Sequence, residues 1–232
     1  SISDILRKKN KIVYLIKNYD NIITSSKYLE LKSNEISKKN NCKYICASID
    51  TKRFNVRKNH IKKDVVNIGW TGTYTTIKYL KLFEKTLFEI NKIRKIKLIV
   101  IGNFEYNNTK LISEFIHWNH DTEIQDLLKL DIGLYPIQED EWSKGKSGLK
   151  ALQYMALGIP CIATNFGNIK KIISNNINGY LINDDQQLYQ TLINLIDNHD
   201  LRNKIGNNSI KLINKSYSID AINQQYLDVI EN

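Results

Sequence analysis

Short runs of consecutive apolar residues, rich in β-branched side chains, recur along the chain between residues 65 and 182. Continuous runs of this kind are typical of strands whose two faces are both buried. The two prolines, Pro136 and Pro160, lie at the edges of two such runs, where a missing N–H group harms a sheet least. We predict strands at 65–70, 97–102, 131–136, 159–164 and 179–182.

Segments in which apolar residues recur at intervals of three and four separate these strands. Because strands and helices alternate along the chain, we predict an α/β fold built on a doubly wound parallel sheet of Rossmann-like type. The predicted helices are 75–94, 121–130, 147–157, 167–175, 184–197, 199–214 and 219–230.

Residues 1–57 are predicted to form a different unit. The segment DNIITSSKYLELKSNEISKK is typical of one strand and one helix, and KYICASIDTKRF is a further extended piece that leads into a lysine-rich linker near 56–64. So small a unit cannot bury a core of its own. We therefore expect it to be the end of a preceding domain, followed by a second domain at 58–232.

The composition indicates a globular chain. It has 232 residues, of which 42% are hydrophobic, enough for a sizeable core in one or two domains. No apolar run reaches the roughly 18 residues of a membrane-spanning helix. The first ten residues, SISDILRKKN, lack the apolar middle region of a secretory signal, so we expect a cytoplasmic protein.

Cysteines and histidines do not predict a metal site or a disulfide framework. Cys42, Cys46 and Cys161 are an odd number without metal-ligand spacing, so we expect reduced side chains. His117 and His120 are three residues apart but have no second cluster of ligands, and we predict no metal there.

The formal net charge of +10 suits an anionic partner. Lysines are spread along the whole chain, without a concentrated basic stripe interleaved with aromatic residues, so we expect no nucleic-acid partner. A phosphorylated ligand and peripheral contact with an acidic membrane surface both remain open.

Two glycine-containing loops follow predicted strands: GWTGTYTT at 69–76 and GKSG at 145–148. Ligands of α/β sheets bind beyond the carboxyl ends of the strands, where glycine admits close approach and helix amino ends offer free N–H groups. Neither loop has the spacing of a P-loop or of a dinucleotide fingerprint. Each is equally well explained as a plain turn.

The helix predicted after the second loop has two different faces. A phosphate at its amino end would meet the helix dipole, the N–H groups of Ser147 and Gly148, and an ammonium group. A solvated lysine and a surface amide explain the polar face equally well. That polar face holds Lys146, Lys150 and Gln153, and the face expected to pack on the sheet holds Leu149, Leu152 and Ala156.

Three segments resemble, in this order, the carboxyl-terminal nucleotide-sugar-binding domain of the retaining GT-B glycosyltransferases called group 1. The segments are NIGWTGTYTTIKYL (67–80), DIGLYPIQEDEWSKGKSGLKALQYMALGIPCIAT (131–164) and GNIKKIISNNINGYLI (167–182). DNIITSSKYL and IDTKRF also resemble the end of that family's acceptor-side domain and its link to the donor side.

The resemblance implies the donor-binding half of a GT-B fold. Such a protein is a glycosyltransferase of hexosyltransferase type in polysaccharide biosynthesis, which transfers sugar from a nucleotide-diphosphate sugar to an acceptor hydroxyl. The nucleotide sugar is its substrate, and no cofactor is implied. The expected partner is an acceptor-side domain, in the same protein or on a separate chain.

The same resemblance implies the roles of site residues. Many family members hold the pyrophosphate with Arg and Lys after the first strand, whereas this chain has Thr71, Gly72 and Thr73 there and Lys78 further on. GWTGT and GKSG are similar to a subgroup in which a lysine and backbone amides bind the phosphates. The implied site residues are Gly72 and Thr73 for close approach to the donor, Lys146, Ser147 and Gly148 for the pyrophosphate, and Gln153 for the ribose.

Two family carboxylates are missing. The family has two glutamates separated by seven residues, and this chain has Gly145 and Gln153 at those positions. Gln153 can still form hydrogen bonds with ribose hydroxyls. One of the acidic residues at 139–141 is a candidate replacement for the first carboxylate. No catalytic residue is identified, and the loss favours a rival hypothesis, a noncatalytic binding or assembly module that keeps the fold.

Trp118 precedes a segment that the family places near the nucleotide base. It either stacks on that base or is a buried structural residue, and we favour burial.

Overall fold

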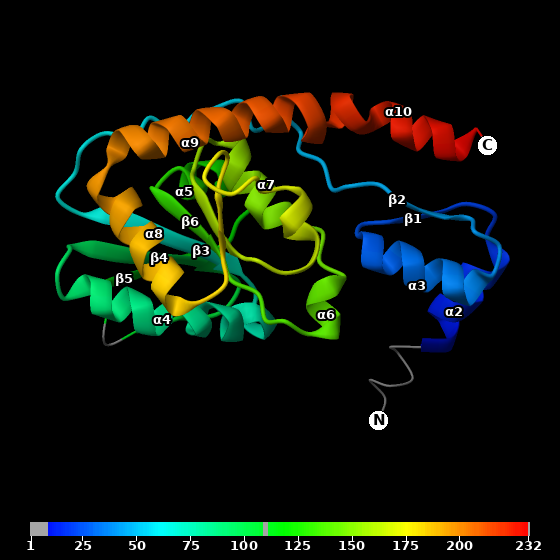
Figure 1. The fold of residues 1–232 in the computed structure, drawn as a ribbon, viewed down its shortest axis with the longest axis horizontal. Coiled ribbons are helices and arrows are strands. Elements are labelled where there is room, and N and C mark those ends of the chain that lie inside the picture. The colour runs from blue at the N-terminus through cyan, green and yellow to red at the C-terminus, as the bar shows by residue number, and fades with distance from the viewer. Residues whose placement is uncertain (1–8, 109–110, 232) are drawn as a thin grey trace.

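The computed structural model describes residues 9–108 and 111–231 (Figure 1). Most of the segment SISDILRKKN, where no secretory signal is expected, lies outside these residues. A six-stranded parallel sheet in the order β5-β4-β3-β6-β7-β8 forms the centre and confirms the predicted doubly wound α/β fold. Its strands are β3 (Val66–Gly72), β4 (Ile96–Gly102), β5 (Ser113–His117), β6 (Ile132–Tyr135), β7 (Cys161–Thr164) and β8 (Tyr180–Ile182).

Helices cover both faces of this sheet, which is why its central strands are apolar on both sides. In β4, Leu98 and Val100 pack on one face, and Ile99 and Ile101 pack on the other. The first face is covered by α4 (Ile77–Asn91), which follows the short turn η1 (Tyr74–Thr76), and by α8 (Asp185–Asp197). The other face is covered by α5 (Glu123–Leu127) and α7 (Leu149–Ala156), with α9 (His199–Leu212) beside α7.

Several elements differ from the sequence prediction. The edge strand β5 was missed because its residues SEFIH include only two apolar side chains and are partly exposed, so they form no long apolar run. The short helix α6 (Glu141–Lys144) was also missed. The helix predicted at 167–175 is only the 3-10 turn η2 (Gly167–Lys171). There the side chain of Asn178 accepts the Ser174 N–H at 2.7 Å and takes the place of a helical acceptor.

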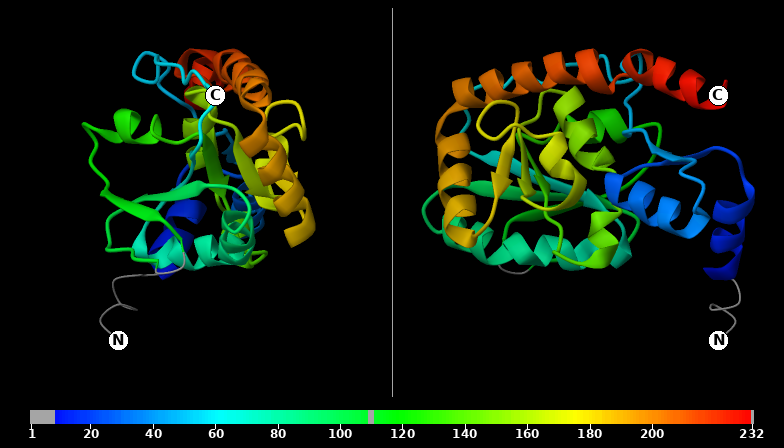
Figure 2. Two further views of the ribbon diagram at one scale, coloured as in Figure 1. Left: turned by 90° about the vertical axis from the view of Figure 1, so that its left-hand side faces the viewer. Right: turned by 45° about the vertical axis from the view of Figure 1, so that its right-hand side comes forward.

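The N-terminal unit is small. It contains α2 (Lys9–Asn18), which was not predicted, α3 (Lys27–Ser37), and the two-stranded parallel sheet of β1 (Ile22–Thr24) and β2 (Cys42–Tyr44). The last helix, α10 (Ile219–Ile230), follows α9 through the π turn η3 (Ile213–Tyr217) and reaches over this unit (Figure 2). Its contact buries Ile222 and Val229 against Ile45, which follows β2.

The linker near 56–64 is anchored on the sheet at the amino end of β6. Asp131, fully buried, accepts two hydrogen bonds from Lys63 at 2.7 and 2.9 Å and one from the Asn67 N–H at 2.9 Å. His60 is also buried, and desolvation lowers its pKa to about 4, so this imidazole is neutral at pH 7. The linker is therefore part of the packed domain.

Cys42, Cys46 and Cys161 are free thiols, as predicted. None of the described helices is long and apolar enough to cross a membrane.

Candidate functional site

The candidate site lies where the order of the sheet reverses, between β3 and β6. In doubly wound sheets the crevice at this switch point, beyond the carboxyl ends of the strands, is the usual place for a ligand. Here it is a cavity of about 330 Å³. Side chains from three parts of the sheet domain surround it, and Ser25 of the N-terminal unit completes it. The residues that matter for its chemistry are Trp70, Tyr79, Tyr135, Lys146 and Lys150.

Helix α7 is fixed at the edge of this cavity by contacts of its buried face. The Tyr154 hydroxyl accepts the N–H of Thr71 at 2.9 Å and so ties the helix to the end of β3. Gly133 makes this possible, because a Cβ there would lie 2.6 Å from the Tyr154 ring. Gly148 precedes the helix with a φ of +86°, a conformation that favours glycine. The amino end of α7 is therefore held next to the crevice.

Two ammonium groups share the cavity. Lys146 Nζ lies 5.1 Å from the centroid of the Tyr79 ring, and Lys150 Nζ lies 5.4 Å from that of Trp70. Desolvation and the neighbouring Lys146 lower the pKa of Lys150 to about 8. Desolvation also lowers the pKa of Lys146, although Asp140 partly offsets this effect. Among the described residues, neither lysine has a carboxylate within ion-pair distance.

Backbone donors accompany these cations. In the part of the chain that the structure describes, no acceptor takes the N–H of Ser147 or Gly148. The N–H groups of the first turn of α7 and its dipole favour negative charge at the same place. The predicted phosphate residues Lys146, Ser147 and Gly148 thus lie together, and Lys150 joins them as a second cation.

The first glycine loop lies at the end of β3. Gly72 is buried, and a Cβ at this position would come within 2.0 Å of the Trp70 ring, so glycine is needed to accommodate that indole. Thr73 is exposed, and its side chain forms a capping box with Thr76 at the start of η1. Gly72 and Thr73 therefore each have a structural role, besides the close approach to a donor that the sequence predicts for them.

One prediction about α7 is wrong. Leu152 and Ala156 pack on the sheet as expected, but Leu149 is 42% exposed and lines the cavity. The helix begins only at Leu149, directly after the left-handed Gly148, and this places the first side chain toward the crevice.

The acidic residues before α6 have local partners. Asp140 caps α6, where its carboxylate accepts the Ser143 N–H at 2.7 Å, and the pKa of Asp140 is lowered by this bond. Glu141 accepts hydrogen bonds from Lys144 and from the Tyr28 hydroxyl. Glu139 is exposed in the loop, and Gly145 has no carboxylate to offer.

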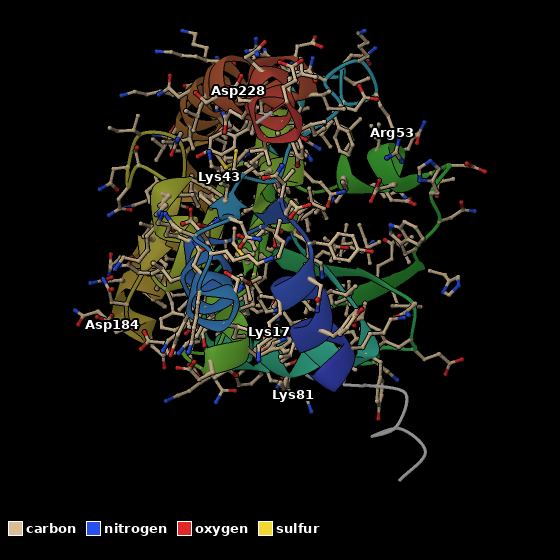
Figure 3. All side chains as sticks on the ribbon, turned by 90° about the vertical axis from the view of Figure 1, so that its right-hand side faces the viewer. Lys17, Lys43, Arg53, Lys81, Asp184 and Asp228 are labelled. Atoms are coloured by element: carbon tan, nitrogen blue, oxygen red, sulfur yellow. The ribbon has the colours of Figure 1, made fainter. Side chains whose placement is uncertain are left out.

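Gln153 does not line the cavity and belongs to a separate polar cluster with Glu123. Its Nε2 donates to Glu123 Oε1 at 3.0 Å, and the indole Nε1 of Trp118 donates to the same oxygen at 3.1 Å. Arg53, labelled in Figure 3, extends from the linker and its Nη2 lies 2.9 Å from Glu123 Oε2. Trp118 is 43% exposed, so the expectation of a buried structural tryptophan is wrong.

Sequence reasoning missed Glu123 and Arg53. They lie far from Gln153 along the chain, and only the pairing of the sheet strands brings them together. The one available signal was an acidic residue at the start of a predicted helix, which is a common capping position. His117 and His120 belong to no group of three metal-ligating side chains among the described residues.

Comparison with known proteins gives a family match. Residues 65–198 match the model of the family described as glycosyl transferases group 1. The N-acetyl-alpha-D-glucosaminyl L-malate synthase of Bacillus anthracis is 29% identical over 85 residues, which are 36% of this chain and 22% of that protein.

Solved structures share the fold. The C-terminal domain of the group 1 glycosyl transferase LpcC from Francisella tularensis has a TM-score of 0.56 at 23% identity, over 74% of this chain and 99% of that one. TarM of S. aureus has a TM-score of 0.75 at 16% identity, over 97% and 46%. Anabaena Alr3699/HepE, in complex with UDP and glucose, has a TM-score of 0.74 at 13% identity, over 95% and 65%. This chain therefore spans about a fifth of the curated relative and about half of TarM.

Proposed function

This chain belongs to the group 1 glycosyl transferases, and from that premise we propose that it is the donor-binding part of a retaining glycosyltransferase. It would hold a nucleotide-diphosphate sugar while an acceptor hydroxyl attacks the anomeric carbon, with retention of configuration. The proposal includes a role in polysaccharide biosynthesis, which rests on the family resemblance, and the cytoplasmic location that we expect from the sequence.

The observation that carries the proposal is the pair of cations in the switch-point cavity. Lys146 and Lys150 face a space of about 330 Å³ beside unpaired backbone donors, and no described carboxylate neutralises them. Partly buried cations without a counterion are costly, so such a site favours a bound anion. In sugar transfer the leaving nucleoside diphosphate gains negative charge, and fixed cations and N–H groups stabilise that charge.

The roles of the individual site residues are part of the same proposal. We assign Lys146, Ser147, Gly148 and Lys150 to the pyrophosphate, and Gln153 to the ribose. Gly72 and Thr73 border the same end of β3 and would lie near the donor. Anabaena HepE, which shares the fold, was solved in complex with UDP-glucose, in agreement with a nucleotide-sugar ligand. The proposal requires no metal and no cofactor.

The proposed partner is an acceptor-side domain, in the same protein or on another chain. The division into 1–57 and 58–232 assigns the N-terminal unit to that domain. Its support is the unit itself: a sheet of only two parallel strands with exposed apolar side chains on the flanking helices. The most exposed of them are Ile12, Tyr14 and Leu31.

Calorimetric titration of the chain tests the proposal. We expect UDP or GDP to bind, and the corresponding nucleoside without phosphates to bind at least about 100-fold more weakly because the charged contacts are lost. The rival hypothesis of an assembly module predicts that neither diphosphate binds. If one binds, donor hydrolysis and transfer, measured with and without an acceptor-side protein, distinguish an enzyme from a binding module.

A further inference from the structure

The amide of Gln153 has one orientation fixed by its neighbour. Glu123 is 9% exposed, and its Oε1 accepts hydrogen bonds from Gln153 Nε2 and Trp118 Nε1 at 3.0 and 3.1 Å. Its Oε2 forms an ion pair with Arg53, whose Nη2 lies 2.9 Å away. A carboxylate that faces a guanidinium and two N–H donors accepts hydrogen bonds and donates none. Only the NH₂ group of Gln153 can therefore face Glu123.

The opposite side of the amide is then an acceptor. Because the two polar atoms of an amide point in different directions, Oε1 of Gln153 lies on the side away from Glu123. No described donor contacts this oxygen, and it is not among the buried unpaired atoms, so it reaches solvent. Gln153 thus presents a lone acceptor at the carboxyl end of the sheet, about one turn of α7 beyond Lys150.

We infer that Glu123 is a positioning residue, which holds Gln153 so that its Oε1 accepts hydrogen bonds from the ribose hydroxyls of the donor. The inference rests on the proposed function, since it assigns a role within the same nucleotide site. The neutral amide of Gln153 then accepts the hydrogen bonds that a carboxylate would accept in its place. The negative charge is on Glu123, which is hydrogen-bonded to the other side of this amide.

The arrangement also explains why residue 153 is glutamine. A glutamate here would place its carboxylate within hydrogen-bond distance of Glu123, and two facing carboxylates repel. The identities of residues 123 and 153 are therefore coupled: one is acidic and the other is an amide. The same geometry predicts that the two can be exchanged, with the carboxylate at 153 and the amide at 123.

The test compares ribose discrimination in four proteins. Each protein is titrated with UDP and with 2′-deoxy-UDP, or with the guanine pair if GDP is the better ligand. The four proteins are wild type, Glu123→Gln, Gln153→Glu and the exchange variant Glu123→Gln/Gln153→Glu. The readout is the ratio of the two Kd values in one preparation, which a loss of folded protein does not change. Glu114→Gln is the matched control, because Glu114, on β5, pairs with Lys97 of β4 and not with Gln153.

We expect wild type and the control to bind the ribonucleotide about five- to tenfold more tightly than the deoxy form. Glu123→Gln loses this preference because the amide of Gln153 can then turn over. Gln153→Glu also loses it because the two carboxylates repel. The exchange variant regains it, since the amide of residue 123 donates to the new carboxylate, and a purely structural role of Glu123 would not produce this rescue.

Other outcomes overturn the inference. It is wrong if Glu123→Gln keeps the wild-type ratio, if the exchange variant fails to regain it, or if wild type binds both nucleotides equally. In each of these cases binding of the diphosphate itself leaves the proposed function intact. Failure of wild type to bind any nucleoside diphosphate instead overturns the proposed function, and this inference with it.

Discussion

Lys150 is the residue whose environment depends most on a ligand. Its ammonium lies over the Trp70 ring without an ion-pair partner among the described residues, and its pKa is lowered to about 8 by desolvation and by Lys146. A diphosphate bound beside it would favour the charged form and raise this pKa again.

Nucleotide binding is therefore expected to take up a proton near pH 8. In the free protein part of the Lys150 population is neutral at this pH, whereas in the complex it is charged, so affinity falls as the pH rises through about 8. Calorimetry in two buffers with different ionisation enthalpies measures the uptake. Lys150→Ala should abolish most of it, and equal uptake by this variant would assign the proton to another group.

Among individual residues, the loop residues of the site were easier to predict from the sequence than the side chains that contact Gln153. Lys146, Ser147 and Gly148 are consecutive, so a loop before a helix brings them together whatever the rest of the chain does. The bonds of Gln153 to Glu123 could not be predicted, because they depend on how the sheet places α5 beside α7. Leu149 was misplaced because the helix begins at Leu149 and not at residue 147 as predicted, so Leu149 lies at the entrance of the cavity.

Elements with continuous apolar runs were predictable, and those without them were not. β3, β4, β6, β7 and β8 are buried on both faces and each was predicted from its composition. β5 lies at the sheet edge, and none of its residues is fully buried, so its sequence has no such run. The length of η2 depends on a side-chain bond from Asn178 that replaces a backbone acceptor.

Asp131 holds the linker to the amino end of β6, and its loss is expected to be costly. Asp131→Asn should lower the free energy of unfolding by about 3–5 kcal/mol, because Lys63 would be left without its buried counterion. Asp197→Asn is the matched control, since its pair with Arg94 is exposed and contributes about 1 kcal/mol or less. Urea unfolding at pH 7 compares them, and equal losses would contradict the account.

The carboxylate of Asp131 also makes the free energy of unfolding depend on pH. Burial alone would raise the pKa of Asp131, but the bonds from Lys63 and the Asn67 N–H outweigh it and hold this pKa below its ordinary value of 3.8. The folded state therefore binds this proton less readily than the unfolded state. The stabilisation is complete above about pH 4 to 5 and is lost as the pH falls through the lowered pKa. As the pH falls from 5 to 2, the free energy of unfolding should thus decrease more for wild type than for Asp131→Asn. Urea unfolding at several pH values measures this difference.

The whole molecule is one sheet domain to which a small N-terminal unit is attached by several contacts. In Figure 1, α10 extends over the N-terminal unit. Ile49 pairs with Ser218 at the start of α10, and α10 buries Ile222 and Val229 against Ile45. Across the front of the site, Tyr44 accepts a hydrogen bond from Asn168, and Ser25 lines the switch-point cavity. The unit therefore borders the proposed donor site, as part of an acceptor-side domain would.

The central claim is that a nucleoside diphosphate binds at the cavity of Lys146 and Lys150. The most direct measurement is titration of UDP and GDP into wild type, Lys146→Ala and Lys150→Ala, with Lys204→Ala on the exposed face of α9 as the control. We predict about 10- to 100-fold weaker binding for each of the first two variants and no change for the control. Wild-type affinity in both cavity variants would contradict the claim.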